Sequence, residues 1–176
     1  ALLRERNIDS RQRLTRLLET ARENDELFGK TRQLILALLE AETFERLAQV
    51  LLASIRREFD VEHSRLLLIE DTEHPWHGSG ERIARATAEA TLGGLLRQER
   101  PVAGPLRPQA RETLFGERAD DVLSAVVVSV GRGQPLAVLA LGSSDARRFH
   151  GEMGTMFLEF IGEVLQRLLP PFARQQ

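Results

Sequence analysis

The sequence predicts an α+β fold in which helices cover an antiparallel sheet, and three patterns favour this class. Residues 66–69 are four consecutive aliphatic side chains, which is typical of a strand buried on both faces. Residues 124–142 contain two aliphatic runs joined by a Gly-containing turn, which is typical of a β-hairpin. Helical spacing of apolar residues is clearest at the two ends of the chain, so we expect the end helices to lie on one face of the sheet.

A long helix is expected from residue 2 to about residue 41. This stretch has no Pro, one Gly and many Arg, Glu, Leu and Gln residues, so at 1.5 Å per residue it would extend about 60 Å. Steps of three and four residues along it trace a seam of apolar side chains interrupted by Asn, as in a coiled coil. The seam consists of Leu3, Asn7, Leu14, Leu17, Ala21, Asn24 and Phe28.

This seam predicts a parallel homodimer. Before residue 25 the apolar stripe is narrow and its flanks are charged, so it is too thin to pack on a globular surface. The alternative is a single amphipathic helix that packs on its own domain. We therefore expect two parts, an N-terminal pairing helix over residues 1–30 and a globular domain over residues 31–176.

The first half of the globular part is expected to hold two helices and two strands. Thr43 is a suitable N-cap for a helix that runs to residue 59. A central strand at 65–70 precedes a loop at 71–80, which is rich in turn-forming residues. A short strand at 81–85 and a helix at 87–98 follow.

The second half is expected to complete the sheet and its cover. Prolines confine the strand at 101–106 to a sheet edge, because Pro cannot donate to a central ladder. A helical turn at 109–115 leads to the hairpin, whose two strands are apolar enough to be central. The last helix has a broad apolar face from Met153 to Leu168 and ends before Pro170.

Composition and charge exclude several classes of function. The 176 residues include 24 basic and 26 acidic ones, so no excess of positive charge favours nucleic acid, and we expect no nucleic-acid partner. The chain has no Cys, which excludes thiol nucleophiles, thiolate metal sites and cysteine-linked chromophores. No apolar run approaches the roughly 18 residues of a membrane span, so we expect a cytoplasmic protein without membrane contact.

The hairpin and the first core elements resemble a GAF domain. The resemblance rests on residues 124–143 with Asp145 and Phe149 after them, and on the helix and strand between Thr43 and Ile69. The strings at 3–7, 21–25, 104–107 and 148–155 resemble, more narrowly, the bacterial domain of unknown function 484 family. That resemblance implies about six antiparallel strands flanked by helices, a dimer through the end helices and no assigned activity.

Residues for chemistry are sparse. The absence of Cys excludes the bilin-binding and methionine-sulfoxide-reducing relatives, and the cyclic-nucleotide signature is missing because Lys30 is the only Lys. His74 and His77 lie in one loop without a third metal ligand near them in sequence. No Ser-His-Asp set or phosphate-binding Gly loop is present. We therefore expect no enzyme activity, no metal and no cofactor.

The resemblance places a candidate ligand cavity near the middle of the chain. Arginines there could hold a carboxylate or phosphate, although in a chain with 23 Arg they could equally form a solvated surface. The candidate ligand-binding residues are Trp76, Arg82, Arg85, Gly104, Arg107 and Val128. The expected function is a sensory or regulatory module, dimeric and able to bind a small molecule. The alternative is an interaction scaffold whose cavity is filled by its own side chains.

Overall fold

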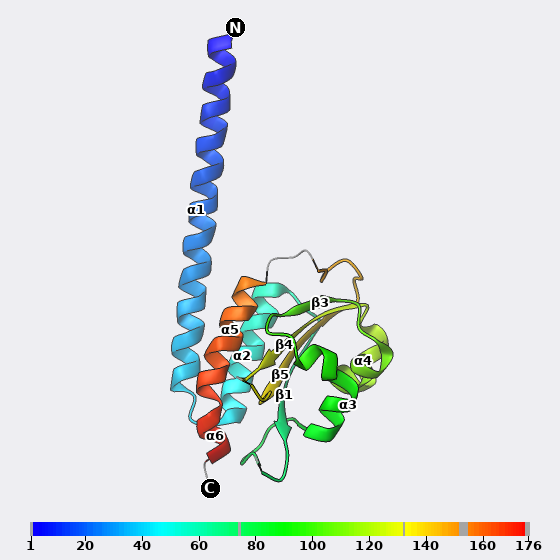
Figure 1. The fold of residues 1–176 in the computed structure, drawn as a ribbon. Coiled ribbons are helices and arrows are strands. Elements are labelled where there is room, and N and C mark those ends of the chain that lie inside the picture. The colour runs from blue at the N-terminus through cyan, green and yellow to red at the C-terminus, as the bar shows by residue number, and fades with distance from the viewer. Residues whose placement is uncertain (1, 74, 132, 152–154, 175–176) are drawn as a thin grey trace. The chain divides into compact units, whose positions relative to one another are not determined.

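The computed structural model describes residues 2–73, 75–131, 133–151 and 155–174. The chain divides into two compact units, residues 1–37 and residues 38–176, and each is described by itself (Figure 1). None of the helices within the described ranges has the length and apolar character that crossing a membrane requires.

The first unit is formed by α1, an uninterrupted helix over Leu2–Glu40 whose last residues enter the second unit. This confirms the long helix expected from the composition. Every seam residue predicted between Leu3 and Phe28 is exposed to solvent. The exposed large apolar residues of this stretch are Leu2, Leu3, Ile8, Leu14, Leu17, Leu18 and Phe28.

The second unit is built on a five-stranded sheet in the order β2-β1-β5-β4-β3. Strands β1, β5 and β4 are central and β3 is an edge strand, as the aliphatic runs and the prolines predict. The strands span His63–Glu70 (β1), Arg82–Ala84 (β2), Val102–Gly104 (β3), Ser124–Val130 (β4) and Ala137–Ser143 (β5).

This sheet and its helices confirm the expected α+β class, and the five strands among the described residues are close to the six or so expected. The sheet is mainly antiparallel, as expected, but one pairing is parallel, which corrects that expectation. Strand β2 pairs with β1 in parallel, with Leu68 opposite Arg82 and Glu70 opposite Ala84. The other three pairings are antiparallel. The reason is the loop at 71–81, which is long enough to carry the chain back along β1 before β2 begins, whereas a tight turn would force antiparallel pairing.

One face of the sheet is covered by α2 (Phe44–Phe59), which packs on β1, and α5 (Met156–Leu168), which packs on β4. The Thr43 side chain accepts a hydrogen bond from the Arg46 backbone N–H at 3.1 Å, which confirms the predicted N-cap. A short helix, α6 (Pro170–Arg174), follows α5. Met156 and Phe160 were expected on the buried face of the last helix, but they are 82% and 42% exposed, and Met153 lies outside the described residues.

The opposite face carries α3 (Arg85–Leu96), α4 (Pro108–Phe115) and the 3₁₀ helix η1 (Gly116–Asp121), as Figure 1 shows for α3 and α4. Strand side chains alternate between the two faces, so Leu67, Ile69 and Val127 point toward α3 and α4. They form one buried apolar cluster with residues such as Leu92 and Leu114. Much of the space between this face and its helices is therefore filled by the protein's own side chains.

Candidate functional site

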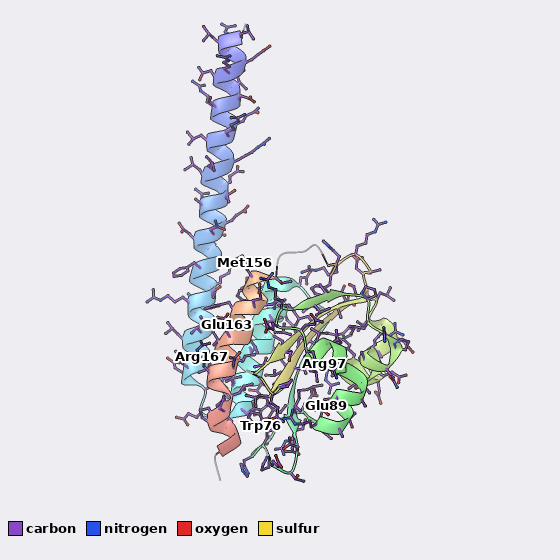
Figure 2. The ribbon with its side chains drawn as sticks, viewed as in Figure 1. Trp76, Glu89, Arg97, Met156, Glu163 and Arg167 are labelled. Atoms are coloured by element: carbon purple, nitrogen blue, oxygen red, sulfur yellow. The ribbon has the colours of Figure 1, made fainter. Side chains whose placement is uncertain are left out.

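A cleft in the described part of the second unit has a volume of about 890 Å³. Its walls come from α3 with the segment that follows it, from the β4–β5 turn and from α5. Figure 2 labels Glu89 and Arg97 on the α3 side and Glu163 and Arg167 on α5. The two helices cover opposite faces of the sheet, and the cleft lies between them at the edge of β4.

The floor of the cleft is a stretch of strand edge that β3 does not cover. Pairing between β3 and β4 extends only to Val102 opposite Val127, whereas β4 continues to Val130. The next residue before β3 is Pro101, which has no N–H to continue the ladder. Val128 and Ser129 therefore line the cleft. The cleft exists here because β3 begins only at Val102 and leaves this part of β4 unpaired.

Two glycines let the backbone come close together around the cleft. A Cβ added at Gly162 of α5 would lie 3.1 Å from Cγ1 of Val128, so the missing side chain lets α5 approach β4. Gly131 has a φ of +137°, and a Cβ there would lie 2.6 Å from the carbonyl oxygen of Gln134. Substitution at either position would push the helix or the turn that borders the cleft.

The two walls carry charges of both signs. Glu89 and Arg97 lie on the α3 side, and Glu159, Glu163 and Arg167 lie on α5. The Arg167 guanidinium donates to the Glu163 backbone carbonyl at 2.9 Å, so the Glu163 carboxylate is not neutralised by this contact. Such walls suit a ligand that itself carries both a positive and a negative group.

Arg85 supplies a fixed positive charge at the deep side of the cleft. Its side chain is 13% exposed; its Nε donates to the Asp71 carboxylate and its Nη1 donates to the Pro135 carbonyl at 3.1 Å. Its Nη2 is buried and has no hydrogen-bond partner among the described residues. Arg85 thus joins the start of α3 to the loop after β1 and to the β4–β5 turn.

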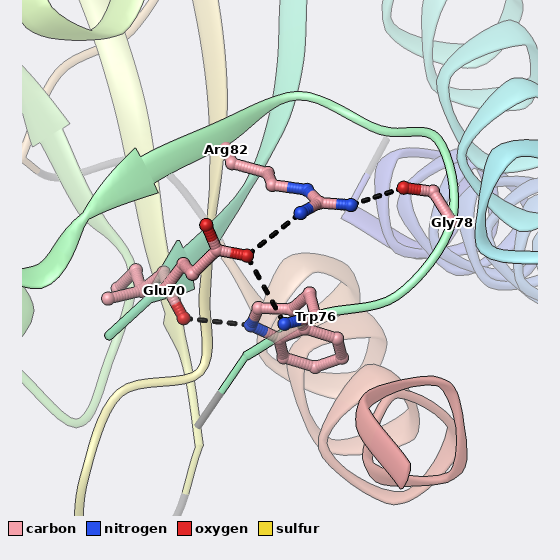
Figure 3. Close-up of polar contacts among 5 residues, drawn as sticks. Glu70, Trp76, Gly78 and Arg82 are labelled. Atoms are coloured by element: carbon pink, nitrogen blue, oxygen red, sulfur yellow. Dashed lines mark hydrogen bonds and ion pairs between the residues drawn. The ribbon is translucent and has the colours of Figure 1, made fainter. Parts of the chain in front are cut away.

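Of the six residues predicted to bind ligand, Arg85 and Val128 line this cleft. Trp76 and Arg82 meet elsewhere, around Glu70 (Figure 3). The buried Trp76 indole donates to the Ile69 carbonyl at 2.8 Å, and the Trp76 backbone N–H and the Arg82 guanidinium both reach Oε2 of Glu70, at 3.2 and 2.9 Å. Arg82 also donates to the Gly78 carbonyl. These contacts hold the loop between β1 and β2 in place.

The remaining two predicted residues lie away from the cleft lining. Gly104 ends β3 opposite Ala125, with a φ of +143° that favours glycine. Arg107 is exposed and precedes α4 as its N-cap residue. The structure therefore brings together two pairs of the predicted residues, one in the cleft and one around Glu70, and leaves these two apart.

Sequence reasoning did not single out the charged residues of the walls, Arg97, Glu163 and Arg167. Glu163 and Arg167 are spaced as neighbours on one helix face, which is also how an ordinary solvated helix face looks. Among the described residues, no three His, Asp or Glu side chains lie close enough together to hold a metal ion, and His74 lies outside those residues. His77 and His150 are exposed.

Comparison with known proteins supports the fold. The family model described as "Protein of unknown function, DUF484" matches residues 1–174. The GAF domain of an Acinetobacter phosphoenolpyruvate-protein phosphotransferase is similar, with a TM-score of 0.54 and 13% identity, over 81% of this chain and 91% of that one. So is the A. aeolicus nlh2 GAF domain in an inactive state, with a TM-score of 0.52 and 14% identity, over 81% and 94% of the two chains. The sequence matches none of the curated proteins.

Proposed function

This chain belongs to the DUF484 family, whose description assigns no function, and from its GAF-like fold and its charged cleft we propose that it is a sensory or regulatory module. The proposal has two parts. The cleft between α3 and α5 binds a small molecule, and α1 associates with a second copy of the chain. Chemistry on the ligand is not part of the proposal.

The observation that carries the ligand-binding part is the presence of both signs of charge in the cleft lining. Arg97 lines the cleft from the α3 side and Glu163 lines it from α5, so Arg97 can hold a carboxylate while Glu163 holds an ammonium group. The volume of about 890 Å³ falls in the usual range for small-molecule sites. We therefore propose a ligand that is small, polar and charged with both signs.

A regulatory role requires that the ligand change the balance between two arrangements of the protein. A ligand that touches both α3 and α5 does this only if it binds one spacing of the two helices better than another. The cleft is suited to such a role because its two walls belong to separate helices and the sheet edge between them is not covered by β3.

The absence of catalytic activity is proposed from the residue types in the cleft. The described lining contains Ser129 but no His, and the chain has no Cys, so an activated nucleophile of the usual kinds has no base beside it.

The second candidate is an interaction scaffold. It is favoured by the buried apolar cluster between the sheet and α3, which fills much of that space with the protein's own side chains. In this case α1 alone would recruit a partner helix, and the cleft would be a surface feature without an occupant.

Native mass spectrometry of the protein purified from a bacterial host tests the proposal. We expect a dimer that carries a small mass in stoichiometric amount, and we expect Arg97→Ala and Glu163→Ala each to reduce that mass. Arg118→Ala is the matched control, because Arg118 lies in η1 with a side chain that is 72% exposed. A dimer without any added mass, even after incubation with free amino acids and short peptides, would favour the scaffold.

A further inference from the structure

Between residues 2 and 26, the charges of α1 are divided into two stretches. Residues 2–18 include five arginines and two acidic residues, whereas residues 19–26 include four acidic residues and one arginine. The arginines of the first stretch are Arg4, Arg6, Arg11, Arg13 and Arg16, and the acidic residues of the second are Glu19, Glu23, Asp25 and Glu26. The first stretch is thus basic and the second acidic.

A parallel pair would place like charges together. In an in-register parallel coiled coil, a residue just before one seam position faces the residue five places further along the partner helix. By this rule Arg6 faces the partner's Arg11, and the contact occurs twice in a symmetric dimer. The basic stretches, residues 2–18 of each helix, would also lie side by side along their whole length, which is destabilising.

An antiparallel pair matches the seam layer by layer. A layer consists of two seam residues, one from each helix, that pack on each other. If the two residue numbers in each layer add to 31, Leu14 packs on the partner's Leu17 and Phe28 packs on the partner's Leu3. In the same register Asn7 meets the partner's Asn24, so the two asparagines of the seam share a layer. The same spacing also passes through Ser10, between Asn7 and Leu14, and Ala21 meets the partner's Ser10, which places two small side chains together.

The flanking charges agree with the same register. Arg4 directly follows Leu3 and Asp25 directly follows Asn24, so both flank the seam on the same side. In an antiparallel pair these equivalent flanking positions face each other, so Arg4 lies beside the partner's Asp25, and this contact occurs twice. Residues 2–12, with three arginines and two acidic residues, then lie along residues 19–29 of the partner, which include the acidic stretch, while residues 13–18 lie beside the same residues of the partner. The flanking ion pair and the distribution of charge thus favour the antiparallel arrangement, and the seam layers are compatible with it.

The structure leaves this face of α1 open. Within the described residues, Leu3, Leu17 and Phe28 are 83%, 68% and 72% exposed, and Leu14 is 57% exposed. We propose that α1 pairs with α1 of a second copy in an antiparallel coiled coil centred between Thr15 and Arg16, in place of the parallel pair that the seam alone suggests. This rests on the proposed association through α1.

Disulfide crosslinking tests the orientation, because the chain has no Cys of its own. In the antiparallel register the two copies of residue 7 are separated by 17 residues of helix, or about 25 Å, far beyond the roughly 7 Å limit for Cα atoms of a disulfide. Residue 7 and the partner's residue 24 lie in one layer. We expect a mixture of full-length Asn7→Cys and Asn24→Cys chains to form crosslinked heterodimers on mild oxidation, and neither variant to crosslink with itself.

Other outcomes are separable. Efficient self-crosslinking of Asn7→Cys would overturn the antiparallel arrangement and leave the dimer intact. A dimeric mass without crosslinks in either experiment would overturn the seam register. A monomeric mass for the unmodified chain would overturn both this inference and the dimer part of the proposed function.

A charge swap provides an independent readout. Asp25→Lys would place a cation beside the partner's Arg4, and we expect dimer dissociation to increase roughly two- to tenfold, as for exposed ion pairs. Combining Asp25→Lys with Arg4→Glu should restore the dimer. In a parallel pair residue 25 faces the partner's Thr20, so failure of the second substitution to rescue the first would contradict the proposal.

Discussion

The helix α1 and the globular unit use their apolar residues in opposite ways. Between Leu2 and Phe28, every large apolar residue of α1 with a described side chain is more than half exposed. In the globular unit, residues such as Leu51, Leu139 and Leu141 are fully buried between a sheet and helices. The sheet and its covers complete their own core, whereas α1 lacks a surface to cover its apolar stripe in a single chain. An isolated helix gains little stability from its own backbone, so most of the stability of a helix must come from packing.

The largest effect is expected where the globular core is opened. Leu139→Ala in β5 removes a fully buried side chain from the centre of the sheet. We expect the free energy of unfolding to fall by about 2–5 kcal/mol, as measured by urea denaturation. Leu36→Ala, at an exposed position of α1, is the control and should change it little. Equal losses for both variants would break the contrast between the two regions.

A second prediction concerns the seam. The double variant Leu14→Ala with Leu17→Ala removes four exposed leucines from a dimer, and we expect the dimer dissociation constant to rise roughly 100-fold, or about 3 kcal/mol. Sedimentation velocity over a concentration series would measure it. Thermal unfolding of the globular unit at a fixed, low concentration should stay unchanged. An unaltered dissociation constant would show that these leucines do not pack in an interface.

A smaller effect is expected in the loop between β1 and β2. Trp76→Phe keeps most of the buried ring but removes the indole donor that reaches the Ile69 carbonyl at 2.8 Å. The Ile69 carbonyl then loses a hydrogen-bond donor in a buried place. We therefore expect the free energy of unfolding, measured by urea denaturation, to fall by about 1–2 kcal/mol. Ser79→Ala in the same loop, at an exposed position, is the control.

The smallest effect is a pH dependence at the start of β1. The side chain and backbone N–H of Ser144 donate to the Glu62 carboxylate at 2.7 and 3.1 Å, and these bonds hold the pKa of Glu62 below its ordinary 4.5. A lowered pKa stabilises the folded state above the ordinary value, and this stabilisation is lost as pH falls through the folded pKa. Glu62→Gln should therefore reduce the loss of stability below pH 4.5 slightly. A steeper loss in the variant would contradict this sign.

Much of the fold could be predicted because it depends on local patterns. Four aliphatic residues in a row at 66–69 predict a central strand, Thr43 predicts a helix start, and the prolines near residue 101 predict an edge. The parallel pairing of β2 could not be predicted, since the length of the loop after β1 does not say in which direction the next strand runs. The exposure of Met156 likewise depends on what surrounds the start of α5.

The cleft was less accessible to prediction than the fold. It exists because β3 begins only at Val102, opposite Val127, and because α3 and α5 meet at the uncovered end of β4, and none of this is local in sequence. Arg82 and Arg85 are three residues apart, yet Arg82 contacts Glu70 and Arg85 contacts Asp71, so only Arg85 lines the cleft. Spacing along the chain could not separate these two arginines.

The measurement that tests the contrast between the two regions most directly is sedimentation equilibrium of the full-length chain at micromolar concentration. We expect a dimer of twice the 19.8 kDa chain mass, because the exposed seam of α1 then has a surface to cover it. A mass of one chain across the whole concentration range would contradict this expectation and show that α1 does not pair with a second copy.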